Sequence, residues 1–394
     1  MMKPQIKVLF SFIALIGLLP VKAQVYIPSY AAIVNQCSQS GVLADLTEFQ
    51  NLGVKYRGTA AQANTLQWLK DKYLSYGYSA SQIVEDPFTY SGSNCKNLVV
   101  TKMGTLHPNT YVIIDGHYDT LTGTGTNDNG SGVAVILEIA RLLQNVQTEY
   151  SIKFINFSGE EDGLRGSQHY VTSVVNGTTP KMDIRLVLNI DEIGGVSGMT
   201  NNTITCEHDT SAPTTNNAAS STMTAQMMTC FSLYSALQTT LSNAYASDYM
   251  PFQSNNEIIT GLYETNESPY PHTVNDNLAN MDPVYVYNVA KGAIGSALHF
   301  AVACSNCNLS VNNTSDFHVS AYPNPATSVI YIDKGDLGSY SYKIRNVLGE
   351  TIASKNLRNP KQTETVNVEN LSSGSYFLSI DSGEKHIAKK IMIQ

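Results

Sequence analysis

The fold is decided by one stretch, Tyr111-Val112-Ile113-Ile114-Asp115-Gly116-His117-Tyr118-Asp119, and by the loop that follows it, Asn127-Asp128-Asn129-Gly130-Ser131-Gly132. An apolar run ends in a histidine and two aspartates, and the loop carries another aspartate into a helix. Open α/β sheets place their sites at the carboxyl ends of short buried strands. We therefore expect half of a metal centre here, with the other ligands, a base and a substrate pocket supplied by the rest of the chain.

Predicted strands and helices alternate on both sides of this stretch. Besides 111–115, strands are expected at 97–103, 151–157, 185–193 and 258–263, and helices at 60–76, 132–143, 223–241 and 284–303. Residues 207–222 are rich in Ser, Thr and Asn and are expected to form a loop. The βαβαβ order predicts an α/β fold, a mostly parallel mixed sheet with helices on both faces.

The 394 residues divide into four predicted segments. Residues 1–23 are expected to be a signal peptide, because lysines precede an apolar run and a small-residue cleavage site. That run is shorter than the roughly 20 residues that a membrane-spanning helix needs. Residues 24–307 form the α/β domain and 308–318 an Asn- and Ser-rich linker. Residues 319–394 show short alternating runs between turn signals, which predict a small all-β sandwich.

The composition narrows the possible partners and the redox state. The net charge of −8 argues against a nucleic-acid binder. An acidic middle segment suits a cation site or an amine-bearing substrate. Six cysteines in an exported chain favour disulfides, and the predicted pairs are Cys304 with Cys307, Cys206 with Cys230 and, by elimination, Cys37 with Cys95.

Candidate site residues lie where the predicted strands end, and one comes from a late loop: His117, Asp119, Asp128, Glu160, Glu161, Asp191 and His272. Each alone is more often a cap, a turn former or a satisfied polar residue. Together they reach the same sheet edge, where sites occur. Two zinc ions about 3.5–4 Å apart need a bridging carboxylate, and each ion also takes an imidazole and a further carboxylate. One more carboxylate remains as a base.

Two local spacings add detail to this picture. Asp119 lies two positions after His117, so in an extended chain both point the same way, and Asp119 can accept the second ring N–H of His117. Glu160 and Glu161 are adjacent and point apart, so one can bind metal while the other faces the substrate. The pair is therefore expected to have two different roles.

These segments resemble the M28 family of co-catalytic zinc aminopeptidases. The likeness covers about residues 24–305 and rests on Gly116-His117-Tyr118-Asp119, Asn127 to Gly132, Gly159-Glu160-Glu161-Asp162-Gly163-Leu164-Arg165-Gly166-Ser167, Leu188-Asn189-Ile190-Asp191 and Pro271-His272-Thr273. It implies a fold of the zinc-dependent exopeptidase type with two zinc ions. Asp128 would bridge them, often with a cis bond to the next residue. His117 and Asp191 would complete one ion, and Glu161 and His272 the other.

The resemblance also implies a mechanism. Glu160 would be the general base that takes a proton from a zinc-bridging water and passes it to the leaving amine. Family members place a tyrosine before a Ser-Asp-His segment to help hold the oxyanion. Here that segment is Tyr245-Ala246-Ser247-Asp248-Tyr249, with Tyr249 where histidine is usual. Tyr245 is the candidate donor, and a packing role for it stays open.

The last part of the chain, about residues 319–394, resembles the sorting domains of the type IX secretion system. The signals are Tyr322-Pro323-Asn324-Pro325-Ala326, Val347-Leu348-Gly349, Leu371 to Tyr376 and Lys389-Lys390-Ile391. The resemblance implies export across an outer membrane, to the cell surface or the medium. A carbohydrate-binding or adhesion module is the alternative, but no exposed aromatic platform is discernible.

The sequence therefore predicts an exported di-zinc aminopeptidase that acts on peptides with a free N-terminus. It would meet the secretion machinery through its last domain, and it is expected to be a monomer without nucleic acid or a membrane span. The alternatives are a glutaminyl-peptide cyclotransferase on the same fold, which often uses one zinc, and a non-catalytic surface binding protein. The full set of ligands favours the peptidase over the cyclase, and an intact Glu160 argues against the binding protein.

Overall fold

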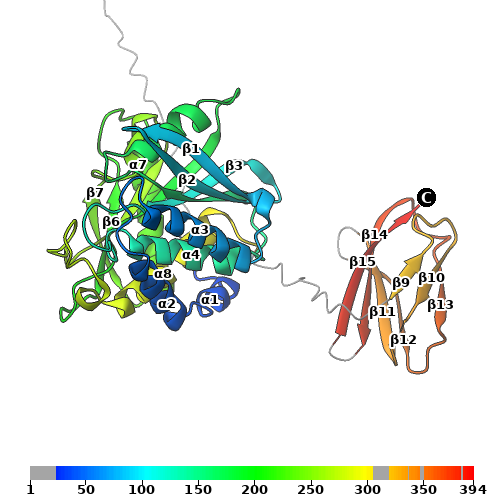
Figure 1. The fold of residues 1–394 in the computed structure, drawn as a ribbon. Helices are drawn as coiled ribbons and strands as arrows, with labels where there is room; N and C mark the ends of the chain where they lie inside the picture. The colour runs from blue at the N-terminus through cyan, green and yellow to red at the C-terminus, as the bar shows by residue number, and fades with distance from the viewer. Residues whose placement is uncertain (1–23, 305–318, 336, 347–349, 383–384) are drawn as a thin grey trace, which may run out of the picture. The chain divides into compact units, whose positions relative to one another are not determined.

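The computed structural model describes residues 24–304, 319–335, 337–346, 350–382 and 385–394 (Figure 1). The chain divides into two compact units, with the division between Ser305 and Asn306. The predicted signal peptide, residues 1–23, and the predicted linker, residues 308–318, lie outside the described residues. The domain boundaries expected at 307 and 319 stay predictions.

The first unit contains an eight-stranded mixed sheet with the order β1-β2-β4-β3-β5-β8-β6-β7. Its central strands β4, β3, β5 and β8 run parallel. The strands are β1 (Ile83–Tyr90), β2 (Ser93–Lys102), β3 (His107–His117), β4 (Tyr150–Phe157), β5 (Asp183–Ile190), β6 (Thr203–His208), β7 (Gln238–Asn243) and β8 (Ile259–Glu264). The four parallel strands place their carboxyl ends at one edge, as the sequence predicted.

Helices cover both faces of this sheet. They are α1 (Pro28–Val34), α2 (Gln39–Asn51), α3 (Ala60–Ser75), η1 (Ala80–Gln82), α4 (Gly130–Leu143), α5 (Arg165–His169), the π-helical η2 (Tyr170–Val175), α6 (Asn217–Tyr234), α7 (Tyr249–Ser254), η3 (Leu278–Asn280) and α8 (Pro283–Phe300). Side chains alternate along each strand, so Val112 and Ile114 of β3 join one core with α1–α4, α6 and α8. Ile113 joins the opposite core with η2 and α7. Figure 1 shows α2, α3, α4 and α8 together on the first face. The predicted fold class is confirmed.

The segment from 203 to 243 differs from the prediction. The expected loop at 207–222 contains the end of β6 and the start of α6 at Asn217. The expected helix at 223–241 ends at Tyr234, and β7 follows it. β7 is an exposed edge strand of Gln, Thr, Leu, Ser and Asn, paired in parallel with β6. A polar edge strand carries no alternating apolar signal, which is why the sequence pattern missed it. β1 and β6 were missed as well.

Two glycines allow α6 and α8 to pack closely. A Cβ atom on Gly292 would lie 2.3 Å from the Phe231 ring, and one on Gly295 would lie 2.5 Å from the Tyr234 ring. Both aromatic side chains belong to α6 and are largely buried. The α6–α8 layer therefore depends on the absence of side chains at these two positions of α8.

The cysteines correct the disulfide prediction. Cys37, Cys95, Cys206 and Cys230 are free and buried, so the predicted pairs Cys37–Cys95 and Cys206–Cys230 are wrong. Cys37 has Glu138 beside it, whereas Cys95 has Asp119 and Ser158 nearby, so these two cysteines have different neighbours. Cys206 and Cys230 pack as small apolar side chains in one core. The third predicted pair includes Cys307, which lies outside the described residues.

The second unit is all β. A three-stranded sheet has the order β13-β10-β9, and a four-stranded sheet has the order β12-β11-β14-β15. The strands are β9 (Ser320–Tyr322), β10 (Val329–Asp333), β11 (Tyr340–Arg345), β12 (Thr351–Leu357), β13 (Thr363–Asn367), β14 (Gly374–Ser382) and β15 (Lys385–Ile393). Ile330 and Ile332 of one sheet share a core with Ile344 and Leu378 of the other. The two sheets thus pack as a sandwich.

Among the helices that the structure describes, none is long and apolar enough to cross a membrane.

The close approach of α6 and α8 gives the first prediction. Gly292→Ala is expected to lower the free energy of unfolding by about 1–3 kcal/mol, because the new methyl group overlaps the Phe231 ring. Urea unfolding followed by the fluorescence of Trp68 measures this, since Trp68 is the only tryptophan of the chain and belongs to the first unit. Val284→Ala, at an exposed position of the same helix, should change stability by less than about 0.5 kcal/mol. Equal stabilities of the two variants would contradict the prediction.

Candidate metal centre

The predicted ligands meet at the carboxyl edge of the sheet. His117 is the last residue of β3, and Asp191 directly follows β5. Glu160 and Glu161 lie in the loop after β4, and Asp128 lies in the loop before α4. His272 comes from the loop between β8 and η3. Neighbouring parallel strands therefore deliver side chains that are far apart in the sequence to one place.

Asp128 stands between the two histidines. Its Oδ1 lies 3.2 Å from Nε2 of His117, and its Oδ2 lies 3.2 Å from Nε2 of His272. Nε2 of His117 is also 3.3 Å from Oδ1 of Asp191, and Nε2 of His272 is 2.8 Å from Oε2 of Glu161. One carboxylate thus faces both imidazoles, and each imidazole has one further carboxylate beside it. The peptide bond from Asp128 to Asn129 is cis, as the resemblance suggested.

The donor atoms fit a metal ion. Ligand atoms of His117, Asp128 and Glu161 lie within 4.8 Å of one another. Oδ1 of Asp191 is buried, and apart from Nε2 of His117 at 3.3 Å it has no polar partner among the described residues. An imidazole nitrogen next to carboxylate oxygens is a donor set that zinc accepts. A buried, unpartnered carboxylate oxygen is costly unless a cation or a donor reaches it, so the five side chains suit divalent ions.

The charges around these side chains also favour a bound cation. Burial alone would lower the pKa of His117, but Asp191, Glu160 and the bond with Asp128 raise it well above its usual value. Hydrogen bonds with Asp128 and Glu161 raise the pKa of His272 to about 11. Burial raises the pKa of Glu161 to about 7, although His272 opposes this. The carboxylates therefore favour positive charge in the site, and bound metal would supply that charge in place of the protons.

The loop that carries Asp128 is fastened by a residue that the sequence did not reveal. The Asp276 carboxylate accepts the main-chain N–H groups of Asn127 at 2.7 Å and of Asp128 at 3.0 Å. Asp276 lies four positions after His272, so one loop carries both a candidate ligand and the group that places another. The sequence offered one signal for this role, namely that Asp276 is an acid close to the predicted ligand His272.

Further bonds fix the same loop to the ends of β5 and β8. The side chain of Asn127 donates to both oxygens of Glu264, at 3.1 Å each. The side chain of Asn129 caps α4 by accepting from Gly132 N at 2.9 Å, and it donates to the carbonyl of Ile190 at 2.8 Å. Asp128 is therefore held on both sides by neighbours whose own side chains are satisfied.

Asp119 lies beside His117, but its contacts differ from the prediction. Nδ1 of His117 is 3.2 Å from the main-chain oxygen of Asp119 and 3.9 Å from its carboxylate Oδ1. The carboxylate instead accepts the main-chain N–H groups of Glu160 at 3.2 Å and of Glu161 at 3.3 Å. Asp119 thus positions the Glu160–Glu161 segment, and its main chain orients the imidazole.

Asp191 is oriented from its other side by Ser247. The Ser247 hydroxyl donates to Oδ2 of Asp191 at 2.6 Å and accepts from the side chain of Asn189 at 2.9 Å. This leaves Oδ1 of Asp191 turned toward His117. Ser247 was named in the sequence only as part of the segment after Tyr245, and its role in holding Asp191 was missed.

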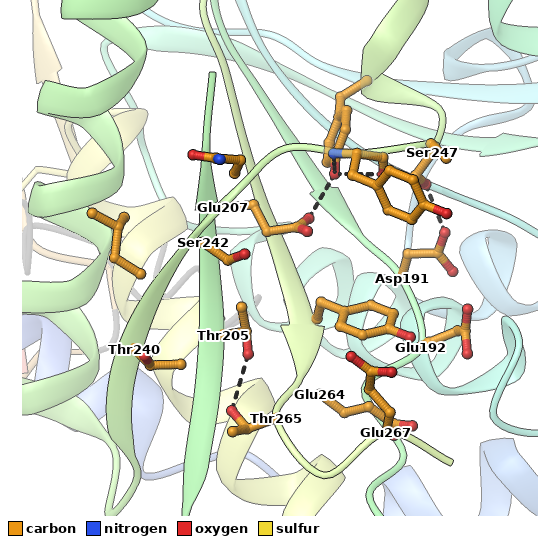
Figure 2. A pocket seen from close by; sticks show the side chains of 16 residues that line it. Asp191, Glu192, Thr205, Glu207, Thr240, Ser242, Ser247, Glu264, Thr265 and Glu267 are labelled. Carbon is orange, nitrogen blue, oxygen red and sulfur yellow. Dashed lines mark hydrogen bonds between the residues drawn. The ribbon is translucent and has the colours of Figure 1, made fainter. Parts of the chain in front are cut away.

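A pocket of 620 Å³ begins at Asp191 and extends between β6, β7 and β8. Figure 2 shows Asp191 bonded to Ser247 and Glu207 bonded to a tyrosine hydroxyl, which belongs to Tyr249, at the same pocket. Tyr245 also lines it, with 79% of its surface exposed. The structure therefore brings Tyr245 to the pocket beside the candidate centre, on its outer side.

Glu160 is half-buried next to the ligands, and burial raises its pKa well above the usual value.

Comparison with known proteins adds to this geometry. The sequence model of "Peptidase family M28" matches residues 97–296, and that of the "Secretion system C-terminal sorting domain" matches residues 320–394. Aminopeptidase YwaD of Bacillus subtilis is 40% identical over 89 residues, 22% of this chain and 19% of the relative. Leupeptin-inactivating enzyme 1 of Streptomyces exfoliatus is 33% identical over 147 residues, 36% of this chain and 32% of the relative. The chain thus aligns with about a fifth to a third of the length of these relatives.

Solved structures share the fold. The LapA aminopeptidase of Legionella pneumophila superposes with a TM-score of 0.62 at 21% identity, covering 75% of this chain and 80% of its own. The glutaminyl cyclase of Macrostomum lignano gives 0.61 at 15% identity, covering 72% and 97%. At these identities the likeness concerns the fold, which accommodates both activities.

The role of Asp276 can be tested by metal affinity. Asp276→Ala is expected to weaken zinc binding about 10–100-fold, because Asp128 loses the bonds that fix its main chain. Competition with a chromogenic chelator measures this affinity without any activity assay. Asn275→Ala, at the exposed neighbouring position, should bind zinc as the unchanged protein does. Equal affinities of the two variants would show that Asp276 does not place the ligand loop.

Proposed function

The chain belongs to peptidase family M28, and on this premise we propose that it is an exported zinc aminopeptidase, which hydrolyses the first peptide bond of peptides with a free N-terminus. One observation carries the proposal. The two oxygens of Asp128 face two different imidazoles at 3.2 Å each, and each imidazole has its own second carboxylate. This is the arrangement that two neighbouring metal ions require.

The proposed residue roles follow from these contacts. His117 and Asp191 would hold one zinc ion, His272 and Glu161 would hold the other, and Asp128 would contribute to both. When bound, the ions supply Lewis acidity and an activated water. Asp128 is kept in place by Asp276, and Asp191 by Ser247. The ligands therefore need little rearrangement to receive the metal.

Glu160 is the proposed general base. Its neighbour Glu161 contacts His272, whereas no metal-binding contact is assigned to Glu160, and the Asp119 carboxylate fixes the main chain of both. Its raised pKa, which burial causes, suits a group that accepts a proton and passes it on to the leaving amine. Tyr245, on the outer side of the pocket, is the proposed donor to the oxyanion.

The base assignment has a direct test. Glu160→Gln is expected to keep the zinc content of the unchanged protein and to lose about 10²–10⁴-fold in kcat on an aminoacyl p-nitroanilide, because the amide cannot accept the proton. Metal analysis and steady-state kinetics on the same preparation measure both quantities. Asp71→Asn, at an exposed position of α3, is the matched loss of one charge and should leave kcat unchanged. Substantial residual hydrolysis by Glu160→Gln would remove Glu160 from this role.

A glutaminyl cyclase is the second candidate, because solved cyclases share the fold. The peptidase predicts two zinc ions per chain and release of p-nitroaniline from aminoacyl p-nitroanilides. The cyclase predicts release of ammonia from a peptide with N-terminal glutamine, often with one zinc. Metal analysis and the two assays on one preparation are expected to give the first result. Ammonia release without p-nitroaniline release would assign the protein to the cyclases.

Export is proposed through the second unit. Residues 320–394 match a secretion sorting domain, and they form a sandwich with its own core. A unit that folds around its own core can serve as a handle for type IX secretion machinery without disturbing the catalytic unit. A purely non-catalytic surface binding protein is less well supported, because the five candidate ligands contact one another and Glu160 is retained in the sequence.

A further inference from the structure

We propose that the pocket beside the metal centre selects peptides whose N-terminal residue has a cationic side chain, lysine or arginine. This rests on the proposed aminopeptidase function and names its substrate class. The pocket has a volume of 620 Å³, within the range of small-ligand sites, and it begins at Asp191, a proposed zinc ligand. A side chain projecting from the first residue of a bound peptide can therefore enter it.

The lining of this pocket is acidic and polar. Besides Asp191 it contains four glutamates: Glu192, Glu207, Glu264 and Glu267. Its remaining residues include several Ser, Thr, Asn and Tyr, and Leu241 and Ala246 are its aliphatic members. None of the sixteen lining residues is Lys, Arg or His. A cationic side chain would meet carboxyl groups here, whereas an apolar one would meet polar walls.

Not every glutamate is free to meet a substrate. Glu264 accepts hydrogen bonds from Gly195 N and Ser268 N, at 2.6 Å each, as well as those from Asn127, so it belongs to the framework of the metal loop. Glu267 is exposed at the rim. Glu192 and Glu207 remain as inner groups.

Glu207 is the best placed of these two. It is 8% exposed, and its Oε2 accepts the Tyr249 hydroxyl at 2.7 Å, which fixes the direction of the carboxylate. Gly261 on the paired strand β8 leaves room for it, since a Cβ there would lie 2.8 Å from Oε2 of Glu207. Figure 2 shows this carboxylate at the wall of the pocket. Glu207 is the proposed anchor for the distal charge of the substrate.

Glu192 supplies the second, independent observation. Its Oε2 is buried without a hydrogen-bond partner among the described residues, although the side chain lines the pocket. A buried carboxylate oxygen that no protein group satisfies is available to a cation from the substrate.

Lysyl and norleucyl substrates test whether these acids bind the distal charge of the substrate side chain. Both carry the same α-amino group and nearly the same side-chain length, and only lysine has the distal ammonium. With the mature zinc-loaded chain, kcat/KM for lysyl and arginyl p-nitroanilides is expected to exceed that for the norleucyl compound at least about tenfold. Glu207→Gln keeps an acceptor for Tyr249 and should lower the lysine-to-norleucine ratio at least about tenfold. Asp71→Asn should leave the ratio unchanged.

The outcomes distinguish this inference from the proposed function. Equal kcat/KM values for the norleucyl and lysyl p-nitroanilides would show that the cationic preference is wrong, while the aminopeptidase function stands. The same conclusion follows if Glu207→Gln leaves the lysine-to-norleucine ratio unchanged. If no aminoacyl substrate is hydrolysed by the zinc-loaded chain, the proposed function fails and the inference falls with it. If Glu207→Gln does not fold, the test is instead to compare how strongly lysinamide and norleucinamide inhibit the unchanged enzyme. Stronger inhibition by norleucinamide would overturn the inference.

Discussion

The site depends on one electrostatic constraint: carboxylates gather at the end of a sheet where few positive charges reach them. Asp119, Asp128, Asp191 and Asp276 are all at least about nine-tenths buried within this edge. Asp119, Asp128 and Asp191 have the two imidazoles as cationic neighbours, whose pKa values rise in response, and Asp276 has Lys55. Such an arrangement is unfavourable for a chain that folds alone, and divalent ions would offset it. Ions bound by these side chains would therefore stabilise this edge of the sheet.

This constraint explains why so much of the neighbouring chain is devoted to holding acids in place. Asp276 fixes the main chain of Asp128, Ser247 fixes Asp191, and Asp119 fixes the Glu160–Glu161 segment. In each case a carboxylate accepts the hydrogen bond, either from a hydroxyl group or from main-chain N–H groups. Mutual repulsion would spread the ligands apart, and the surrounding hydrogen bonds resist that motion.

The sequence predicted the parts of this arrangement that have a strong periodic or positional signal. β3 is apolar on both faces and ends at His117, so its burial and its delivery of a ligand could be read directly. The helix after Asp128 has a continuous apolar face. By contrast, β7 is polar and exposed, and the first half of α6 is rich in Ser and Thr, so neither carried a pattern. The supporting contacts of Asp276, Glu264 and Ser247 join distant segments, and only Asp276, four positions after His272, had a local signal.

The same limit explains why the pocket could not be described from sequence. Its walls come from β6, β7 and β8 and from the segment around Tyr249, the region where the pattern was weakest. Glu207 and Glu192 lie 15 residues apart, and only the antiparallel pairing of β6 with β8, which is itself parallel to β5, brings them to one cavity. An acidic composition indicated an amine-bearing substrate without a location. The structure shows a pocket lined by acids, and because Glu264 is already engaged by Asn127, it separates an acid that supports the metal loop from the acids of the proposed substrate pocket.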